Sequence, residues 1–214
     1  MARIYMKTKL VVFLVFFVML FSSKTAFAVE TFVDFDFSVP ILFEWTKTAN
    51  SRMTSIGLGV NPRVMFTNII GIGGVFDLVI PVKLTTQSGG VQMIARNPDF
   101  DSWVGFQMAL GPAIVPVNKE KFRLYLLPGF HLNTVSYRLY PLRSSIVLIG
   151  VGTSVMSEFQ LTKMLYVNVG FGLYYDFYGS IKVEDRSTLT VTASHSQFTH
   201  DLTFQPKLGV GIRF

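Results

Sequence analysis

The fold is decided by a stretch near the end of the 214-residue chain, Leu165-Tyr-Val-Asn-Val-Gly-Phe-Gly-Leu-Tyr-Tyr-Asp-Phe177. Large apolar residues occupy every second position, and the positions between them include Gly170, Gly172, Tyr174 and Asp176. A period of two places successive side chains on opposite faces, which is the geometry of a β-strand and not of a helix. The stretch therefore predicts a strand with one apolar face and one small or polar face.

The same period recurs in seven further windows, at residues 31–41, 55–66, 70–82, 104–114, 122–132, 147–155 and 202–214. No position on the apolar face of any window is charged, whereas the opposite face holds both charged residues and most of the glycines. Each window is long enough for a tilted membrane strand, which needs roughly 9 to 11 residues.

The glycines decide which face lies inside. A soluble barrel would bury the apolar face and expose the other face to water, but glycine weakens a water-facing strand because it packs nothing and costs entropy. A narrow barrel interior, in contrast, needs small residues beside large ones. The pattern therefore predicts an apolar exterior in contact with lipid and a polar interior.

The connections between the windows alternate in length. Short ones are expected near 67–68, 116–121 and 158–163, and longer ones at 45–52, 84–102, 138–145 and 179–200. Outer-membrane barrels have short periplasmic turns and longer outer loops. The sequence thus predicts an all-β fold, a transmembrane eight-stranded antiparallel up-and-down β-barrel. Residues 188–193 alternate like a strand and could extend a ribbon above the membrane, although an ordinary loop is the favoured interpretation.

The first 28 residues form an export signal. Arg3, Lys7 and Lys9 precede the uninterrupted apolar run Leu10–Phe21, and Ala26-Phe27-Ala28 offers small residues at the positions that a signal peptidase recognises. The run is too short to span a bilayer as a helix, which takes roughly 20 residues. We therefore expect a cleaved signal peptide at 1–28, one barrel domain at 29–214, and an outer-membrane location.

Charge and cysteine content exclude several functions. The chain has 19 basic and 13 acidic residues, but four of the basic ones lie in residues 1–28. The remainder has a net charge of only +2, so we expect no nucleic-acid partner, because such a partner requires a strong basic patch. The absence of cysteine rules out disulfides, thiol catalysis and a cysteine-ligated zinc site.

The last strand carries a resemblance. The chain ends in Phe214, and further apolar residues stand at every second position before it, namely Ile212, Val210 and Leu208. This ending resembles the insertion signal of Gram-negative-type outer-membrane proteins, and the whole chain resembles the small eight-stranded group that includes the OmpX, OmpA membrane-domain and OmpW kinds. The resemblance implies contact with outer-membrane lipid, recognition of the last strand by the barrel assembly machinery, and a monomer. The ending is most like the OmpW kind, which are proposed conduits for small hydrophobic molecules.

Charged residues on the inward face predict a network in the lumen. Closure of the barrel sets the last strand beside the first, and Glu158 is close enough to join the group. The predicted network comprises Asp34, Asp36, Arg63, Asp77, Arg123, Lys207 and Arg213. Buried charges are tolerated only when paired, so we expect a polar core that plugs the barrel. A gated polar path is the alternative.

A second group of inward residues lies nearer the outer end of the barrel. It consists of Trp103, Gln107, His131, Asn133, Tyr137, Tyr174, Asp176 and Tyr178. Aromatic walls with a few polar groups are typical of ligand pockets, so these residues could form a cup for a small molecule. Simple filling of the lumen by hydrogen-bonded tyrosines is the favoured interpretation.

Catalysis is not expected. The histidines His131, His195 and His200 could serve a lipid-modifying enzyme, but no serine follows His131 at the spacing found in outer-membrane deacylases. We expect no metal, because two histidines five positions apart are too little for a site, and no cofactor. A structural or surface-interaction barrel with a plugged lumen is the favoured function, a conduit or binding cup for small hydrophobic molecules is second, and a lipid-modifying enzyme is third.

Overall fold

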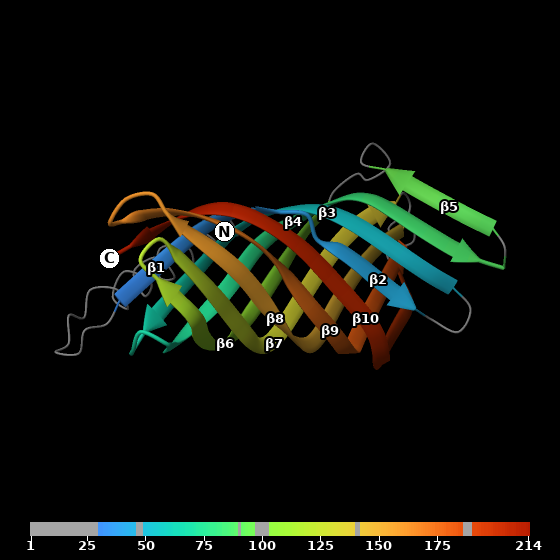
Figure 1. Ribbon diagram of the computed structural model, residues 1–214. Coiled ribbons are helices and arrows are strands. Elements are labelled where there is room, and N and C mark those ends of the chain that lie inside the picture. Colours follow the sequence, from blue (N-terminus) through green and yellow to red (C-terminus); the bar gives the residue numbers. More distant parts are fainter. Residues whose placement is uncertain (1–29, 46–48, 90, 97–102, 140–141, 186–189) are drawn as a thin grey trace, which may run out of the picture.

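The computed structural model (Figure 1) describes residues 30–45, 49–89, 91–96, 103–139, 142–185 and 190–214, so the expected signal peptide lies outside the described residues. All regular elements in these ranges are strands: β1 (Glu30–Ser38), β2 (Ile41–Trp45), β3 (Ala49–Met65), β4 (Ile70–Ser88), β5 (Val91–Arg96), β6 (Trp103–Lys119), β7 (Phe122–Leu139), β8 (Leu142–Gln160), β9 (Leu165–Asp185) and β10 (Thr190–Arg213). These ranges hold no helix that is long and apolar enough to cross a membrane.

The strands close into an antiparallel ring of eight positions. The first position is shared by β1 and β2, which are separated at Val39 and Pro40 because Pro40 has no N–H for the ladder. β1 pairs with β3 on one side and with β10 on the other. The Phe214 amide donates to the Thr31 carbonyl at 2.9 Å, which ties the two ends of the barrel wall together. The predicted fold is confirmed. We call the end that carries the short turns the periplasmic end.

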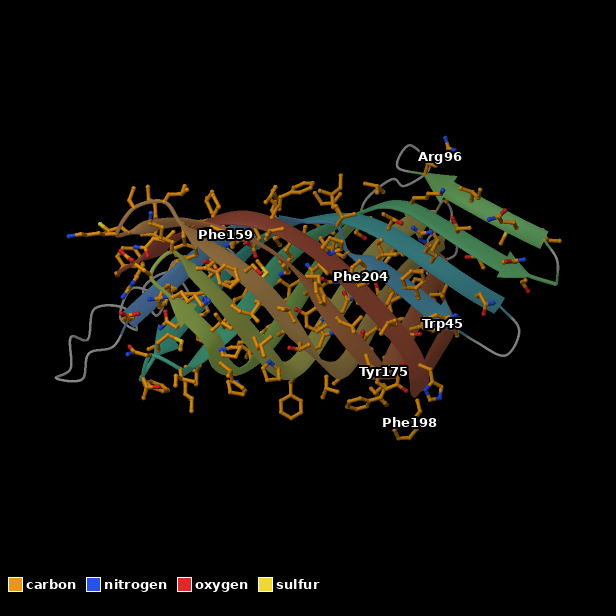
Figure 2. The ribbon with its side chains drawn as sticks, viewed as in Figure 1. Trp45, Arg96, Phe159, Tyr175, Phe198 and Phe204 are labelled. Atoms are coloured by element: carbon orange, nitrogen blue, oxygen red, sulfur yellow. The ribbon has the colours of Figure 1, made fainter. Side chains whose placement is uncertain are left out.

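The two faces of the barrel wall are arranged as the positions of the glycines indicated, with the apolar face outside. Apolar side chains on the outer face are exposed, among them Leu58 at 62%, Leu78 at 60% and Phe130 at 74%, while the inward Asp34 and Asp77 are fully buried. Figure 2 shows Phe159 projecting near one end, and Trp45, Tyr175 and Phe198 near the other. Such an apolar belt with aromatic residues toward its two ends is typical of a barrel that spans a membrane.

The long connections are mostly strand, which corrects the predicted loops at 84–102, 138–145 and 179–200. β4 continues to Ser88 and pairs with β5, and β9 pairs with β10 as far as Asp185 opposite Thr190. β7 likewise pairs with β8 out to Leu139 opposite Leu142. The ladder continues past the apolar belt because each hairpin still satisfies its backbone groups there. The strand-like alternation at 188–193, which was not the favoured interpretation, belongs to this extension from Thr190 onward.

Candidate functional site

Arg63 is the centre of the first ionic layer in the lumen, and it lies two positions before the periplasmic end of β3. Its Nη2 donates to both carboxylate oxygens of Asp34 on β1, at 3.0 and 3.1 Å, and its Nη1 pairs with Glu158 on β8. Nη2 also lies 2.9 Å from the hydroxyl of Tyr166 on β9, which itself donates to Asp34. The ring of Tyr125 on β7 lies 4.2 Å from the guanidinium carbon. One buried cation thus links five strands across the lumen.

Lys207 is the centre of the second layer, farther from the periplasmic end. Its Nζ lies 3.0 Å from Asp77 Oδ2 and 4.0 Å from Asp36 Oδ2. Gln205 donates from Nε2 to Asp77 at 2.8 Å, and Asn61 donates to Asp36. All five side chains are buried. Two carboxylates therefore share one ammonium, and each also accepts a hydrogen bond from an amide group.

The predicted lumen network is divided in the structure into separate groups. Asp34 and Arg63 meet in one layer, and Asp36, Asp77 and Lys207 meet in the other. The remaining two residues, Arg123 and Arg213, instead pair with Glu30 at the periplasmic rim. Sequence reasoning missed Glu30, Tyr166 and Gln205. Tyr166 could have been found, because it stands on the inward face of the quoted strand.

Except for Tyr178, the described residues of the candidate upper cup pack against one another and are buried. His131 Nδ1 lies 2.8 Å from Asp176 Oδ1, and the imidazole stacks on the ring of Tyr174 with centroids 4.1 Å apart and an interplanar angle of 10°. Together with Gln107 and Asn133, these residues are at most 3% exposed. The side chains of Trp103 and Tyr137 lie outside the described residues.

Tyr178 was wrongly assigned to the cup. It is 38% exposed and packs edge-on against Phe198 on the outer surface. The reason is a β-bulge: Gly150 pairs with Asp176, but the next residue on β8, Ile149, pairs with Tyr178, so Phe177 is an extra residue. One inserted residue exchanges the two faces of a strand beyond it, and a strict period of two does not predict where this happens.

An apolar cluster lies on the outer side of the His131 layer, where the sequence predicted only the cup. It comprises Leu42, Met53, Val135, Ile146 and Leu148, with Leu84 and Ile181 packed against it. The signal was present in the run Ile146–Ile149, which is apolar at four successive positions and therefore on both faces. The lumen is therefore ionic near the periplasm and polar in the middle, and at the outer mouth this apolar cluster lies beside the polar side chains of Glu44, Ser51 and Thr86.

The outer surface carries two further features. His200 Nδ1 lies 2.5 Å from the Tyr175 hydroxyl, near the outer end of the apolar belt, whereas the side chain of His195 is outside the described residues. A groove of about 760 Å³ runs over the lipid-facing wall from β6 to β10, where Pro112, Pro128 and Thr153 are among its lining residues. Within the described ranges, no group of three or more His, Cys, Asp or Glu side chains could hold a metal ion.

Comparison with known proteins finds similarity in structure only. No family model matches the chain, and no curated protein matches its sequence. Neisserial surface protein A is similar, with 12% identity, a TM-score of 0.55, and coverage of 86% of this chain and 97% of that one. OprG from Pseudomonas aeruginosa is similar with 12% identity, a TM-score of 0.57, and coverage of 86% and 95%. The chain therefore has the fold of the small outer-membrane β-barrel proteins, and its apolar exterior and polar interior are those of an outer-membrane protein.

Proposed function

We propose that this protein is a non-enzymatic outer-membrane barrel with a closed lumen and a structural or surface-interaction role. The observation that carries the proposal is the succession of buried layers. Arg63 and Lys207 each hold partners from strands on different sides of the ring, and His131 on β7 holds Asp176 on β9. An eight-stranded barrel is just wide enough for its side chains to fill. Outer-membrane lipid surrounds such a barrel, and we propose that the strand ending in Phe214 is recognised by the assembly machinery.

The surface role is supported by a ribbon at the outer end. β4 and β5 extend beyond the rest of the barrel wall (Figure 1), and they pair from Lys83 opposite Arg96 to Ser88 opposite Val91. Within the described part of the chain, β5 has a neighbouring strand on one side only. Val91 and Met93 are 64% and 66% exposed. An exposed edge with apolar side chains is a place where a partner can add a strand.

The closed lumen predicts that the protein does not conduct ions. Reconstituted in a planar bilayer, the wild-type barrel should give no current above that of the empty bilayer. The positive control is a variant with Tyr125→Ala and Tyr174→Ala, which removes two buried rings from the lumen. Current through this variant would show that the assay can detect an open lumen. Heat-modifiable gel mobility checks that both proteins are folded. Stable conductance by the wild type would contradict the proposal.

A second candidate function is passage or binding of small hydrophobic molecules, and the groove on the lipid-facing wall favours it. Filling the groove with Thr153→Phe should slow entry of a small hydrophobic dye into liposomes that carry the protein, because Thr153 lines the groove. The matched control is Thr134→Phe. It adds the same ring to the outer face of the neighbouring strand β7, at a position that does not line the groove. Equal dye entry with wild type, both variants and empty liposomes would remove this candidate.

A further inference from the structure

We propose that the periplasmic mouth of the barrel binds a phosphate group. The mouth forms a partly enclosed pocket of about 20 Å³, which has room for about one water-sized group, such as one oxygen of an anion, and not for a polymer chain. Its charged lining consists of five cations and one acid, namely Lys119, Lys121, Arg123, Lys163, Arg213 and Glu158. A pocket with this excess of positive charge favours an anion.

The positive charge is only partly cancelled by the acids nearby, which are Glu158, Glu30 and, in the turn between Lys119 and Lys121, Glu120. Glu158 is already engaged by the buried Arg63. Glu30 pairs with both Arg213 and Arg123, the latter at 3.6 Å, so two guanidinium groups share one carboxylate. Like charges held close together repel, and an anion between them would relieve that repulsion.

The two arginines are held in place before any ligand arrives. Arg123 donates from Nε to Asn118 Oδ1 at 3.0 Å. The guanidinium carbons of Arg123 and Arg213 lie 5.1 and 5.9 Å from the centre of the buried Phe32 ring. Their side chains are 17% and 31% exposed, so they are only partly hydrated. A fixed guanidinium fork loses little entropy when it binds an oxyanion.

Phosphate fits this set of donors better than a carboxylate does. Two guanidinium groups and three lysine ammonium groups supply more N–H donors than the two oxygens of a carboxylate can accept. A phosphate group has four oxygen atoms, whether free or in a lipid headgroup, against the two of a carboxylate, and arginine binds it in bidentate fashion. The lysines lie in the turns around the mouth, where they can reach a group seated on the arginines.

The phosphate could belong to a lipid headgroup or be free in the periplasm, since arginine and lysine bind the phosphate oxygens of either one. Leu161 and Met164, in the same turn as Lys163, are 65% and 55% exposed. Exposed apolar residues at a barrel turn place the mouth beside the membrane surface. Lipid phosphate is therefore within reach, and the experiment must separate the two sources.

The test is a titration of the folded protein in uncharged detergent with inorganic phosphate, followed by NMR of the amides of residues 118–123 and 161–164. Saturable shifts are expected. Lys121→Gln combined with Lys163→Gln should weaken binding about tenfold or more, because each removes a charge-assisted contact. Both lysines are exposed in turns, so the fold should persist. Lys83→Gln, which removes one exposed charge at the outer end, should leave binding unchanged.

A second arm uses nanodiscs of phosphatidylcholine with or without phosphatidylglycerol. Shifts of the same amides on adding phosphatidylglycerol identify a lipid headgroup as the source, and shifts with inorganic phosphate alone identify free phosphate; either result supports the phosphate site. The proposal is overturned if neither probe moves these amides, or if Lys83→Gln weakens binding as much as the double variant does.

Discussion

Replacing Arg63 with methionine is expected to lower the free energy of unfolding by about 3 to 5 kcal/mol, the usual cost of breaking a buried ion pair from one side. The methionine cannot neutralise Asp34 or Glu158, and both carboxylates are buried against the positions that the guanidinium occupied. The loss should appear in urea unfolding of the detergent-solubilised barrel and as a lower temperature for heat-modified gel migration.

The cause can be separated from lost packing. Adding Asp34→Asn and Glu158→Gln to Arg63→Met should recover a large part of the stability, because neutral amides do not need the cation. Lys83→Met, at an exposed position, removes the same charge from the surface and should change the stability by less than about 0.5 kcal/mol. If the triple variant is no more stable than Arg63→Met alone, the first layer is held by shape and not by charge.

The sequence predicts the ring and its faces because a period of two depends only on which side of the wall each residue occupies. Asp34 and Asp77 are fully buried inside while Leu58 and Leu78 face outward, and this alternation extends through each strand of the belt. Such a pattern is local. It needs no knowledge of which strands meet across the lumen, and it therefore survives in a single sequence.

Contacts across the lumen depend on strand stagger, which the alternation does not encode. The sequence correctly predicts that Arg213 and Arg63 point into the lumen. It does not predict the stagger of the strands, which places Arg213 beside Glu30 at the rim and Arg63 beside Glu158. The bulge at Phe177 exchanges the faces of the last part of β9 and takes Tyr178 out of the lumen. Layers and bulges thus require the register, and the sequence specifies them only through many weak preferences.

The close backbone spacing between β6 and β7 predicts that Gly111→Ala, which adds a single methyl group, strongly lowers the free energy of unfolding. A Cβ atom at position 111 would lie 1.9 Å from the carbonyl oxygen of Pro128 and 2.8 Å from the Cα atom of Gly129. Both are backbone atoms, so neither can rotate away. The strands must separate at a point where the ladder is already interrupted between the pairs Leu110–Phe130 and Ile114–Leu126.

The gap in the β6–β7 ladder has a physical cause. This cause also explains why the strands cannot distribute the strain of an added methyl group along their length. Continuing the register through the gap sets Pro112 opposite Pro128, and neither has an N–H to donate. At this gap in the ladder, β6 and β7 stay in contact because Gly111 and Gly129 have no side chains and their backbones approach closely. We therefore expect Gly111→Ala to lower the free energy of unfolding by about 3 kcal/mol, the upper end of the usual cost of overpacking.

Gly57→Ala is the matched control for this effect, because it adds the same methyl group to another inward glycine. Its Cβ would meet the Ser38 hydroxyl at 2.2 Å, and its next neighbours stand at 3.6 Å. The hydroxyl can rotate away at the expense of the 3.0 Å hydrogen bond from Gln205, which costs about 1 kcal/mol. Urea unfolding of both variants measures the difference. Equal losses at the two positions would mean that the β6–β7 wall yields as easily as a side chain, and that Gly111 and Gly129 do not hold it closed.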